Sequence, residues 1–269
     1  MWRLGLKENF EMSVSIFTSV VNRPEFLEIQ QKLFKKFLKC EYQFNVIDDS
    51  LDDSISSEFK NVSDEYNITY YRKSQENRSR DESRWAGARH ATETIQWTFD
   101  EIIKKKHSED LVLFLDSDMF LLDEFDIEEY MRDAIIAALP QTRGHVKYIW
   151  NGIMFFDMKK VLAIDPDLNF SDGMVDGELT DIGGHFYYYF KKNNLSFKET
   201  DVTYPTHFQE IEIQSDDITQ GFNFELHLNG KFLHYRAGTN WHTQSNWKGK
   251  DDPLKTKEEI FKRIVGEFI

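Results

Sequence analysis

Two aspartates directly follow an apolar run in the segment EDLVLFLDSDMFLL. Asp116 and Asp118 come after residues 111–115, whose unbroken apolar character predicts a buried strand. On extended backbone, side chains at i and i+2 point the same way, so both carboxylates address one point just past the strand end. Such hard oxygen ligands suit a divalent cation. We therefore expect the pair to hold a metal ion; the alternative is a solvated strand end or a helix cap.

The Asp-x-Asp pattern alone is weakly specific. The chain has 47 acidic residues and repeats the pattern at Asp165 and Asp167. Around that second copy the residues are polar and include Pro166, which predicts only a turn. The buried strand that precedes the first copy therefore distinguishes Asp116 and Asp118 as the candidate site.

Alternating strands and helices precede the acidic pair. Asn22 is a plausible cap for a helix that has Pro24 in its first turn. Apolar residues recur at helical spacing over residues 88–102 and predict a second helix, whereas residues 51–65 form a polar stretch. The predicted strands cover residues 13–21, 43–50, 67–71 and 111–115.

These strands are expected to form a parallel sheet. Right-handed crossovers through the intervening helices lead to that arrangement, and ligands of such sheets bind at the carboxyl ends of the strands. The polar residues at those ends should therefore lie together. They are Asn22, Arg23, Asp48, Asp49, Asp116 and Asp118.

The second half of the sequence has a different residue pattern. Residues 146–161 predict two short apolar strands around Asn151 and Gly152, and a Gly- and Asp-rich passage follows. Near the end, apolar and polar residues alternate on both sides of Asn229 and Gly230, which is a strong hairpin signal. No clear linker separates the halves, so we expect one domain over residues 1–269.

The composition excludes several classes of function. A formal net charge of -14 opposes broad binding to nucleic acid or anionic membranes. The single cysteine, Cys40, excludes an internal disulfide framework and a cysteine-rich zinc site. No apolar run approaches the roughly 18 residues that a membrane span needs, and the start lacks a signal-peptide core. We expect a soluble, cytoplasmic protein without a transmembrane segment.

The acidic motif and its neighbours resemble a known enzyme family. LVLFLDSDMFLL is similar to the strand and Asp-x-Asp motif of nucleotide-sugar glycosyltransferases with the GT-A fold, and FTSVVNRPEFL, VIDDS, GARHA and NGIMFFD resemble their other segments in family order. The resemblance covers roughly residues 13–157. It implies an α/β fold: a Rossmann-like central mixed sheet flanked by helices, with a fused smaller sheet on the acceptor side. Residues from about 13 to 118 would bind the nucleotide sugar, and residues from about 119 to 269 would bind the acceptor.

The resemblance also implies residues for the sugar donor. The acidic pair would hold a metal on the donor's diphosphate, while Asp48 and Asp49 would bond its base or ribose. The arginines near the GARHA segment would be supplementary cations; the alternative is an exposed helix start. For Asn22 and Arg23 the alternative is simple capping. The donor-side residues are Thr18, Asn22, Arg23, Asp48, Asp49, Arg80, Arg84, Arg89, Asp116 and Ser117.

A distant segment implies a third metal ligand. HYRAGTNW, from His234 to Trp241, is similar to the segment that supplies a metal-binding histidine in glycogenin-like enzymes and related galactosyltransferases, although the usual Lys-Pro before the tryptophan is absent. An imidazole completes manganese coordination beside carboxylates. The expected metal set is Asp116, Asp118 and His234, binding Mn²⁺ or Mg²⁺. His207, His227 and His242 are weaker candidates.

The acceptor side is less sharply indicated. An inverting transfer needs a general base, for which Asp181 is the candidate beside Gly183 and Gly184, with Asp176 and Glu178 as rivals. A retaining transfer can proceed without such a base, and the resemblance points to both outcomes. Trp150, Trp241 and Tyr187 either stack on sugars or pack in the core. The acceptor-side residues are Trp150, Asn151, Gly152, Gly184 and His185.

Together these features predict a metal-dependent glycosyltransferase. It would move a sugar from a nucleotide-diphosphate sugar, with UDP favoured over GDP, to a hydroxyl of a glycan or other acceptor. One alternative is a sugar-phosphate nucleotidyltransferase, but TSVVNRPEF lacks the glycine-rich loop that cradles a triphosphate. Another is a non-catalytic carbohydrate-binding module, which has no need of a metal and diphosphate site.

Overall fold

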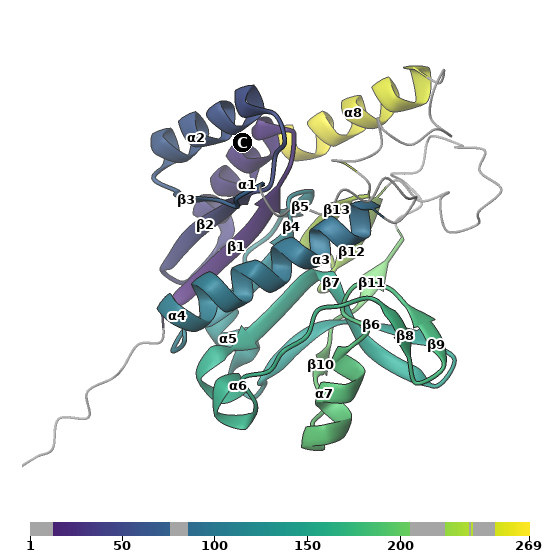
Figure 1. Cartoon of the computed structure of the whole chain (residues 1–269). Helices are drawn as coiled ribbons and strands as arrows, with labels where there is room; N and C mark the ends of the chain where they lie inside the picture. Colours follow the sequence, from purple (N-terminus) through teal and green to yellow (C-terminus); the bar gives the residue numbers. More distant parts are fainter. Residues whose placement is uncertain (1–12, 76–85, 205–223, 237, 239–250) are drawn as a thin grey trace, which may run out of the picture.

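A large mixed β-sheet forms the centre of the protein. The computed structural model describes residues 13–75, 86–204, 224–236, 238 and 251–269. Its largest sheet has seven strands in the order β10-β6-β7-β4-β1-β2-β3 (Figure 1). The strands are β1 (Val14–Val20), β2 (Tyr42–Asp48), β3 (Thr69–Arg72), β4 (Leu111–Asp116), β6 (Ile136–Arg143), β7 (Val146–Asp157) and β10 (Lys198–Glu199).

The strand directions confirm the parallel sheet that the first half of the sequence predicts. β3, β2, β1 and β4 are mutually parallel neighbours, so their carboxyl ends share one edge. β7 then joins β4 antiparallel, and β6 joins β7 antiparallel, which makes the sheet mixed. The prediction of two short strands around Asn151 and Gly152 is wrong, because β7 runs without a break through both residues.

Helices cover both faces of this sheet. The buried side chains of α1 (Pro24–Phe37), α2 (Asp53–Tyr66) and α5 (Ile127–Met131) pack on one face. Those of α3 (Ala86–Thr98), the π-helical turn η1 (Phe99–Ile103), α6 (Met158–Ile164) and α7 (Phe186–Asn193) pack on the other, and the short α4 (Lys104–Lys106) follows η1. The α/β fold with helices flanking a central mixed sheet is therefore confirmed.

One helix and one helix cap differ from the sequence-based expectation. The polar stretch contains α2, whose buried residues are Ser56, Phe59 and Ser63, so its apolar stripe is too thin to read from the sequence. The helix cap predicted at Asn22 is wrong, because α1 begins after Arg23, which has the left-handed backbone angle φ of 65°.

A smaller antiparallel sheet is attached beyond β4. It has the order β11-β12-β13-β5 and contains the predicted hairpin around Asn229 and Gly230, where both residues adopt positive φ. The strands are β5 (Met119–Leu121), β11 (Val202–Thr203), β12 (Phe224–His227) and β13 (Phe232–Tyr235); a separate hairpin pairs β8 (Gly173–Val175) with β9 (Glu178–Thr180).

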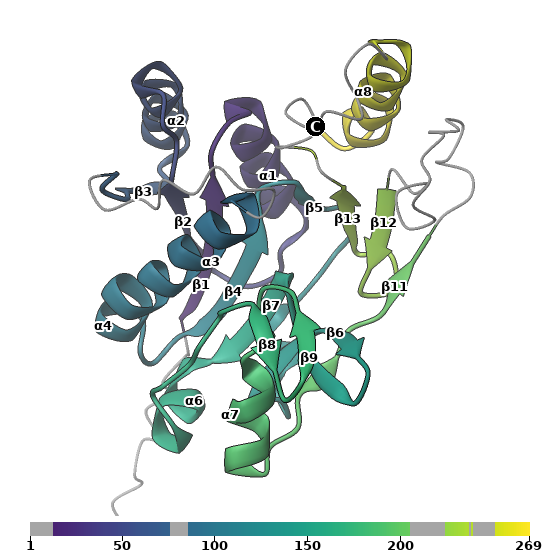
Figure 2. The ribbon, with the colours of Figure 1, turned by 45° about the vertical axis from the view of Figure 1, so that its right-hand side comes forward.

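The last helix, α8 (Asp251–Gly266), packs beside the smaller sheet (Figure 2). The Phe261 ring lies 4.7 Å from that of Phe120 in β5, 5.0 Å from Tyr235 in β13 and 5.3 Å from Phe26 in α1. This aromatic cluster fixes α8 next to the turn that carries the acidic pair. No helix in the described part of the chain has the length and apolar character to cross a membrane.

Candidate active site

The acidic pair lies where the chain passes from one sheet to the other. β4 ends at Asp116 in the large sheet, Ser117 and Asp118 form a turn, and β5 begins at Met119 in the small sheet. The buried Gln30 of α1 holds this turn, because its side-chain amide donates to the carbonyl oxygens of Asp116 (3.0 Å) and Met119 (2.9 Å). The backbone of the turn is thus anchored by a side chain of a helix that precedes it by many residues.

Strand register brings His234 to the acidic pair. β13 pairs antiparallel with β5 so that His234 lies opposite Met119, the residue after Asp118. The Tyr235 amide donates to the Asp118 carbonyl oxygen at 2.9 Å, and His234 Nε2 lies 3.6 Å from Asp118 Oδ1. The hairpin that ends the small sheet therefore delivers an imidazole to the end of β4.

These three side chains fit a divalent cation. Potential ligand atoms of Asp116, Asp118 and His234 all lie within 4.8 Å of one another. Burial, the Asp118 charge and a contribution from Asp181 raise the pKa of the Asp116 carboxyl to about 7, although His234 opposes the rise. A cation between the carboxylates would relieve that repulsion. Two carboxylates with one imidazole suit Mn²⁺ or Mg²⁺, as the sequence predicts.

Glu225 orients the histidine. It lies opposite His234 across the β12–β13 pair, and its Oε2 is 2.8 Å from His234 Nδ1. A carboxylate only accepts, so this geometry assigns the proton to Nδ1 and directs Nε2 toward Asp118. Burial lowers the tendency of His234 to protonate, but the Asp118 charge and the Glu225 bond outweigh it and raise its pKa. This is the carboxylate–histidine arrangement that orients metal ligands.

Other groups hold Glu225 in turn. Arg236 Nε lies 3.1 Å from its Oε1, and His227 Nε2 lies 3.4 Å from its Oε2. Burial opposes ionisation of Glu225, yet these neighbours keep its pKa well below the usual range. Glu225, His227 and His234 also have potential ligand atoms within 4.8 Å of one another. Because the His234–Glu225 bond is direct, we interpret this second group as support for the first.

Replacing Glu225 by glutamine tests this support. The variant keeps an acceptor but removes the charge that favours the Nδ1-protonated ring, so we expect Mn²⁺ affinity to fall by about 10- to 100-fold with little change in folding. Titration calorimetry with Mn²⁺ measures the loss. Glu199→Gln is the matched control, because Glu199 is an exposed strand residue paired with Lys147. Equal affinities in both variants would contradict the orienting role.

Metal binding should also depend on pH. The Asp116 carboxyl must ionise to bind a cation, and its pKa is raised from the ordinary 3.8 to about 7. Affinity for Mn²⁺ is therefore expected to be highest above pH 7 and to fall by up to about tenfold per pH unit below it. The stability of the metal-free protein should depend on pH in the opposite direction. Because the pKa of Asp116 is raised, its carboxyl contributes stability at low pH, and this contribution is lost as the pH rises through 7. Calorimetric titrations at pH 6 and 8 check the first effect; equal affinity at both would contradict it.

Gly238 closes the site from the side. Its amide donates to Asp118 Oδ2 at 2.8 Å and to the Tyr235 carbonyl oxygen at 2.9 Å. A Cβ added there would lie 2.9 Å from Asp118 Cβ and 2.6 Å from Tyr235 Cδ1. Only a glycine permits such a close approach of the backbone to the Asp118 side chain.

Cationic side chains surround this backbone segment. Arg23 donates to both carboxylate oxygens of Glu258 in α8, at 2.8 and 3.1 Å, and to the Gly238 carbonyl oxygen at 3.3 Å. The Tyr235 hydroxyl also donates to Glu258, at 2.7 Å. Arg23 therefore joins the β1–α1 connection to α8, which suits a structural role. The neighbouring Lys257 of α8 is buried, and its Nζ donates to the Arg236 carbonyl oxygen at 2.5 Å.

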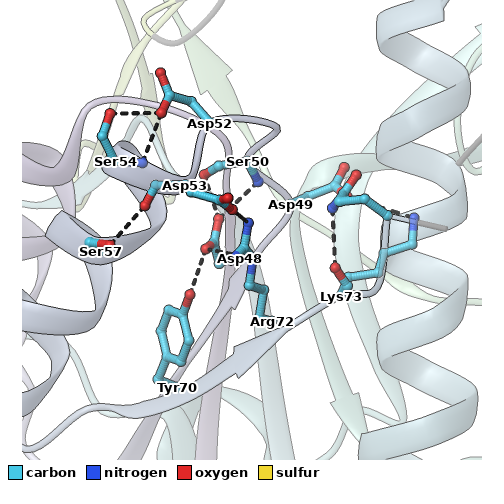
Figure 3. A network of polar contacts seen from close by, with 11 residues as sticks. Asp48, Asp49, Ser50, Asp52, Asp53, Ser54, Ser57, Tyr70, Arg72 and Lys73 are labelled. Atoms are coloured by element: carbon cyan, nitrogen blue, oxygen red, sulfur yellow. Dashed lines mark hydrogen bonds and ion pairs between the residues drawn. The ribbon is translucent and has the colours of Figure 1, made fainter.

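The two aspartates at the end of β2 have different surroundings (Figure 3). Asp48 is fully buried; its Oδ1 accepts from the Ser50 amide at 2.8 Å and its Oδ2 from the Tyr70 hydroxyl at 2.6 Å. Protein donors thus occupy both oxygens. Asp49 turns to the opposite side, where Oδ1 accepts from Gln75 at 3.2 Å and lies 3.8 Å from Lys73 Nζ.

The remaining donor-side residues are scattered. Thr18 is fully buried inside β1, and its hydroxyl has no hydrogen-bond partner among the described residues. Ser117 is buried in the acidic turn, whereas Asn22 is partly exposed just before α1. Arg89 is exposed in the first turns of α3. The predictions for Arg80, Arg84, Trp241, His207 and His242 lie outside the described residues.

Trp150 lies against the histidines of the small sheet. Its indole stacks on His227, with ring centroids 5.5 Å apart and planes at 11°, and lies 5.2 Å from the His234 ring. The absent side chain of Gly152 makes room, because a Cβ there would lie 2.0 Å from Trp150 Cη2. Asn151 is buried. Trp150 therefore packs against His227 and His234, and its place on the acceptor side stays a prediction.

Asp181 follows β9 and is exposed. Its Oδ1 accepts from its neighbour Ile182 at 2.8 Å, and its charge contributes to the raised pKa of Asp116. The rivals are engaged elsewhere: Asp176 accepts from the Tyr187 hydroxyl at 2.7 Å, and Glu178 lies 3.8 Å from His145. These contacts favour Asp181 as the carboxylate that faces the metal site.

Two other acceptor-side residues follow Asp181. Gly184 is buried, and a Cβ there would lie 1.9 Å from Thr180 Oγ1. His185 lies 3.3 Å from the Asn169 side-chain amide and helps to line a surface pocket of about 370 Å³. Asp165 and Tyr188 line the same pocket. His185 therefore contributes to a surface pocket, whereas Gly184 provides close backbone packing.

Comparison with known proteins places this site in context. No protein-family model matches the sequence, and no curated protein is similar to it. The solved structures that it resembles are glycosyltransferases. Galactosyltransferase LgtC, solved with donor and acceptor sugar analogues, shares 13% identity over 94% of this chain and 96% of its own, with a TM-score of 0.45.

Two further structures are similar over part of the chain. Mannosyltransferase PcManGT from Pyrobaculum calidifontis, solved with GDP-Man and Mn²⁺, shares 11% identity over 61% of this chain and 49% of its own, with a TM-score of 0.39. Mouse xyloside xylosyltransferase 1 shares 10% identity over 56% and 69%, with a TM-score of 0.35. At such identities the likeness to glycosyltransferases describes architecture, and the chemistry must come from the residues of the site.

Several site residues escape sequence reasoning. Gln30 and Gly238 bond to the acidic turn directly, whereas Glu225 contacts it only through His234, and Lys257 lies beside Tyr235 and Arg236. Glu225 and His227 share one face of β12 by their spacing, which is a usable signal only once the pairing with β13 is known. The other three have no local pattern that points to the site.

Proposed function

We propose that the protein is a metal-dependent glycosyltransferase that uses a nucleotide-diphosphate sugar, with UDP as the favoured nucleotide. The observation that supports this most is the convergence of Asp116, Asp118 and His234 at the junction of the two sheets. The like charges of Asp116 and Asp118 and the raised pKa of Asp116 describe a site that favours a bound cation. The acceptor is a hydroxyl of a glycan or another molecule.

The residues have separate roles in this proposal. Asp116, Asp118 and His234 hold the ion, and Glu225 orients the histidine. When bound, a divalent ion stabilises the negative charge that develops on the diphosphate as it leaves the sugar. Asp49 at the end of β2 binds the nucleoside side of the donor. The Gln30 side chain keeps the backbone of the acidic turn in place, and the Gly238 amide holds the Asp118 carboxylate.

The stereochemical outcome follows from the role of Asp181. If it accepts the proton of the acceptor hydroxyl, the transfer inverts the anomeric centre. Its exposure and its charge near Asp116 support this assignment. Asp181→Asn would then abolish transfer while leaving Mn²⁺ affinity largely unchanged. A retaining enzyme would keep transfer in that variant, and analysis of the product's anomeric configuration distinguishes the two cases.

Thermal-shift screening of UDP and GDP sugars, with Mn²⁺ and with EDTA, tests the function. We expect a nucleotide sugar to raise the melting temperature only with the metal, and slow metal-dependent release of the free nucleotide. Stabilisation by nucleoside triphosphate and sugar phosphate would instead indicate a nucleotidyltransferase. Stabilisation by free glycans alone, with no effect of metal or nucleotide, would indicate a carbohydrate-binding module. Either result would reject the proposal.

A further inference from the structure

A second group of metal-ligating side chains includes His234. Glu225 and His227 are two residues apart on β12 and therefore point to the same face of the small sheet, and Glu225 lies directly opposite His234 on β13. Potential ligand atoms of the three residues all lie within 4.8 Å of one another. All three residues are buried, yet the side chains of Glu225 and His234 keep 10% and 8% of their surface exposed, so the group is open to solvent on one side.

His227 is the member of this group whose polar atoms lack partners. Its side chain is fully buried, and neither ring nitrogen has a hydrogen-bond partner among the described residues. Nε2 lies 3.4 Å from Glu225 Oε2, which is longer than a formed charge-assisted hydrogen bond. The ring stacks on Trp150, so packing accounts for its carbon atoms. Packing does not account for two buried nitrogens, which cost stability unless they bind something.

One carboxylate oxygen of Glu225 faces both histidines. Oε1 is engaged by Arg236, whose Nε lies 3.1 Å away. Oε2 lies 2.8 Å from His234 Nδ1 and 3.4 Å from His227 Nε2. Ligand atoms around a tetrahedral zinc ion with bonds of about 2.0 Å are about 3.3 Å apart. The two measured separations are close to that value, so small side-chain rotations would close the group around an ion.

The donor types of this group select a different metal from that of the acidic pair. Two imidazoles and one carboxylate form a set that binds Zn²⁺ and leaves a fourth position for water. Mn²⁺ and Mg²⁺ prefer sites that are richer in oxygen, such as the two carboxylates of Asp116 and Asp118 with His234. The two groups therefore differ in metal preference while they share one histidine.

The two groups use opposite nitrogens of His234. Nε2 lies 3.6 Å from Asp118 Oδ1, whereas Nδ1 lies 2.8 Å from Glu225. A neutral imidazole has a proton on one nitrogen and a lone pair on the other, so it can bind a metal through only one of them. Zinc on Nδ1 would displace the proton from that nitrogen, and Nε2 would take up a proton from solvent. Nε2 could then donate to Asp118 but could no longer bind a cation.

We propose that Glu225, His227 and His234 form a second metal site that binds Zn²⁺, and that zinc bound there prevents His234 from serving the acidic pair. The zinc site stands on its own geometry, whereas its antagonism toward Mn²⁺ rests on the metal site of the proposed function. Without zinc, Glu225 orients His234 toward the acidic pair. With zinc, Glu225 becomes a ligand, and His234 binds through its other nitrogen.

Variants with a disabled acidic pair test the zinc site by calorimetry with Zn²⁺ alone. Asp118→Asn should still bind zinc, because the second group is intact. Adding His227→Gln should weaken zinc binding by more than the roughly 100-fold that loss of an outer partner of a ligand costs. Adding His145→Gln instead is the matched control, because His145 is an exposed histidine beside Asp176 and Glu178. Equal zinc affinity in the two double variants, or loss of zinc binding in Asp118→Asn alone, would overturn the site.

Nitrogen NMR of the unaltered protein tests the antagonism and needs no His227 variant that folds. Histidine labelled with ¹⁵N reports which ring nitrogen of His234 carries the proton and which binds a metal. Zinc should bind Nδ1 and leave the proton on Nε2, whereas with Mg²⁺, used in place of paramagnetic Mn²⁺, the proton should stay on Nδ1. Zinc on Nε2 would overturn the proposal. Failure of Mg²⁺ and Mn²⁺ to bind would count against the proposed function alone, because the zinc result does not depend on them.

Discussion

Replacing Asp118 by asparagine should abolish metal-dependent donor binding and reduce sugar transfer by about 100-fold or more, because a metal on a leaving diphosphate contributes several kcal/mol. Asparagine still accepts the bond from the Gly238 amide, so the turn between β4 and β5 should keep its shape. Calorimetry with Mn²⁺ and a nucleotide-release assay measure the two losses, and circular dichroism checks the fold.

The second Asp-x-Asp supplies the matched control. Asp167 is exposed, and its amide donates to Asp165 Oδ1 at 3.0 Å in the turn that the sequence predicts there. Asp167→Asn should therefore leave Mn²⁺ affinity and transfer unchanged. Transfer at the normal rate in Asp118→Asn would reject the acidic turn as the metal site, whatever the control shows.

Gly183→Ala is expected to destabilise the protein by about 3 kcal/mol and to impair transfer. Gly183 has φ of 88°, and a Cβ there would lie 2.2 Å from the backbone carbonyl oxygen of Ile149 in β7. The collision involves backbone on both sides, so the segment after β9 must move. That segment includes Asp181, the candidate base, and its displacement should lower transfer beyond the loss of stability. Thermal unfolding should show a fall in melting temperature of several degrees.

Gly177→Ala separates the collision from the backbone strain. Gly177 has φ of 89°, almost the same angle, but nothing lies within 4 Å of a Cβ added there. We expect a loss of about 1 kcal/mol from strain alone and normal transfer. Equal destabilisation by the two substitutions would show that the contact with Ile149 is unimportant.

The sheet could be predicted from the sequence because its signals are local. The apolar runs of β1, β2 and β4 each end in polar residues, and the Asn229-Gly230 turn predicts the β12–β13 hairpin. α2 escaped because its buried stripe consists of two serines and Phe59. β7 was divided because Asn151 and Gly152 look like a break, whereas Gly152 accommodates the Trp150 ring within the strand.

The sequence predicts candidate site residues that belong to a local motif. It does not predict those whose position depends on strand register. Asp116 and Asp118 follow from the strand that precedes them. Glu225 contacts His234 only through the pairing of β12 with β13, and Lys257 lies beside Tyr235 only through the docking of α8; no local pattern encodes either contact. Ligand binding by Asp48, which its position at a strand end suggested, stays a prediction; in the structure its two oxygens accept bonds from Ser50 and Tyr70.

The turn between β4 and β5 gives the two sheets a common joint. Asp116 ends a strand of one sheet, and His234 belongs to a strand of the other. An ion bound by both residues would link the two sheets. The geometry of its ligands would then depend on the angle between the sheets. Substitutions in either hydrophobic core, far from every metal ligand, would then change the affinity for the ion. Core packing and metal binding would therefore be coupled.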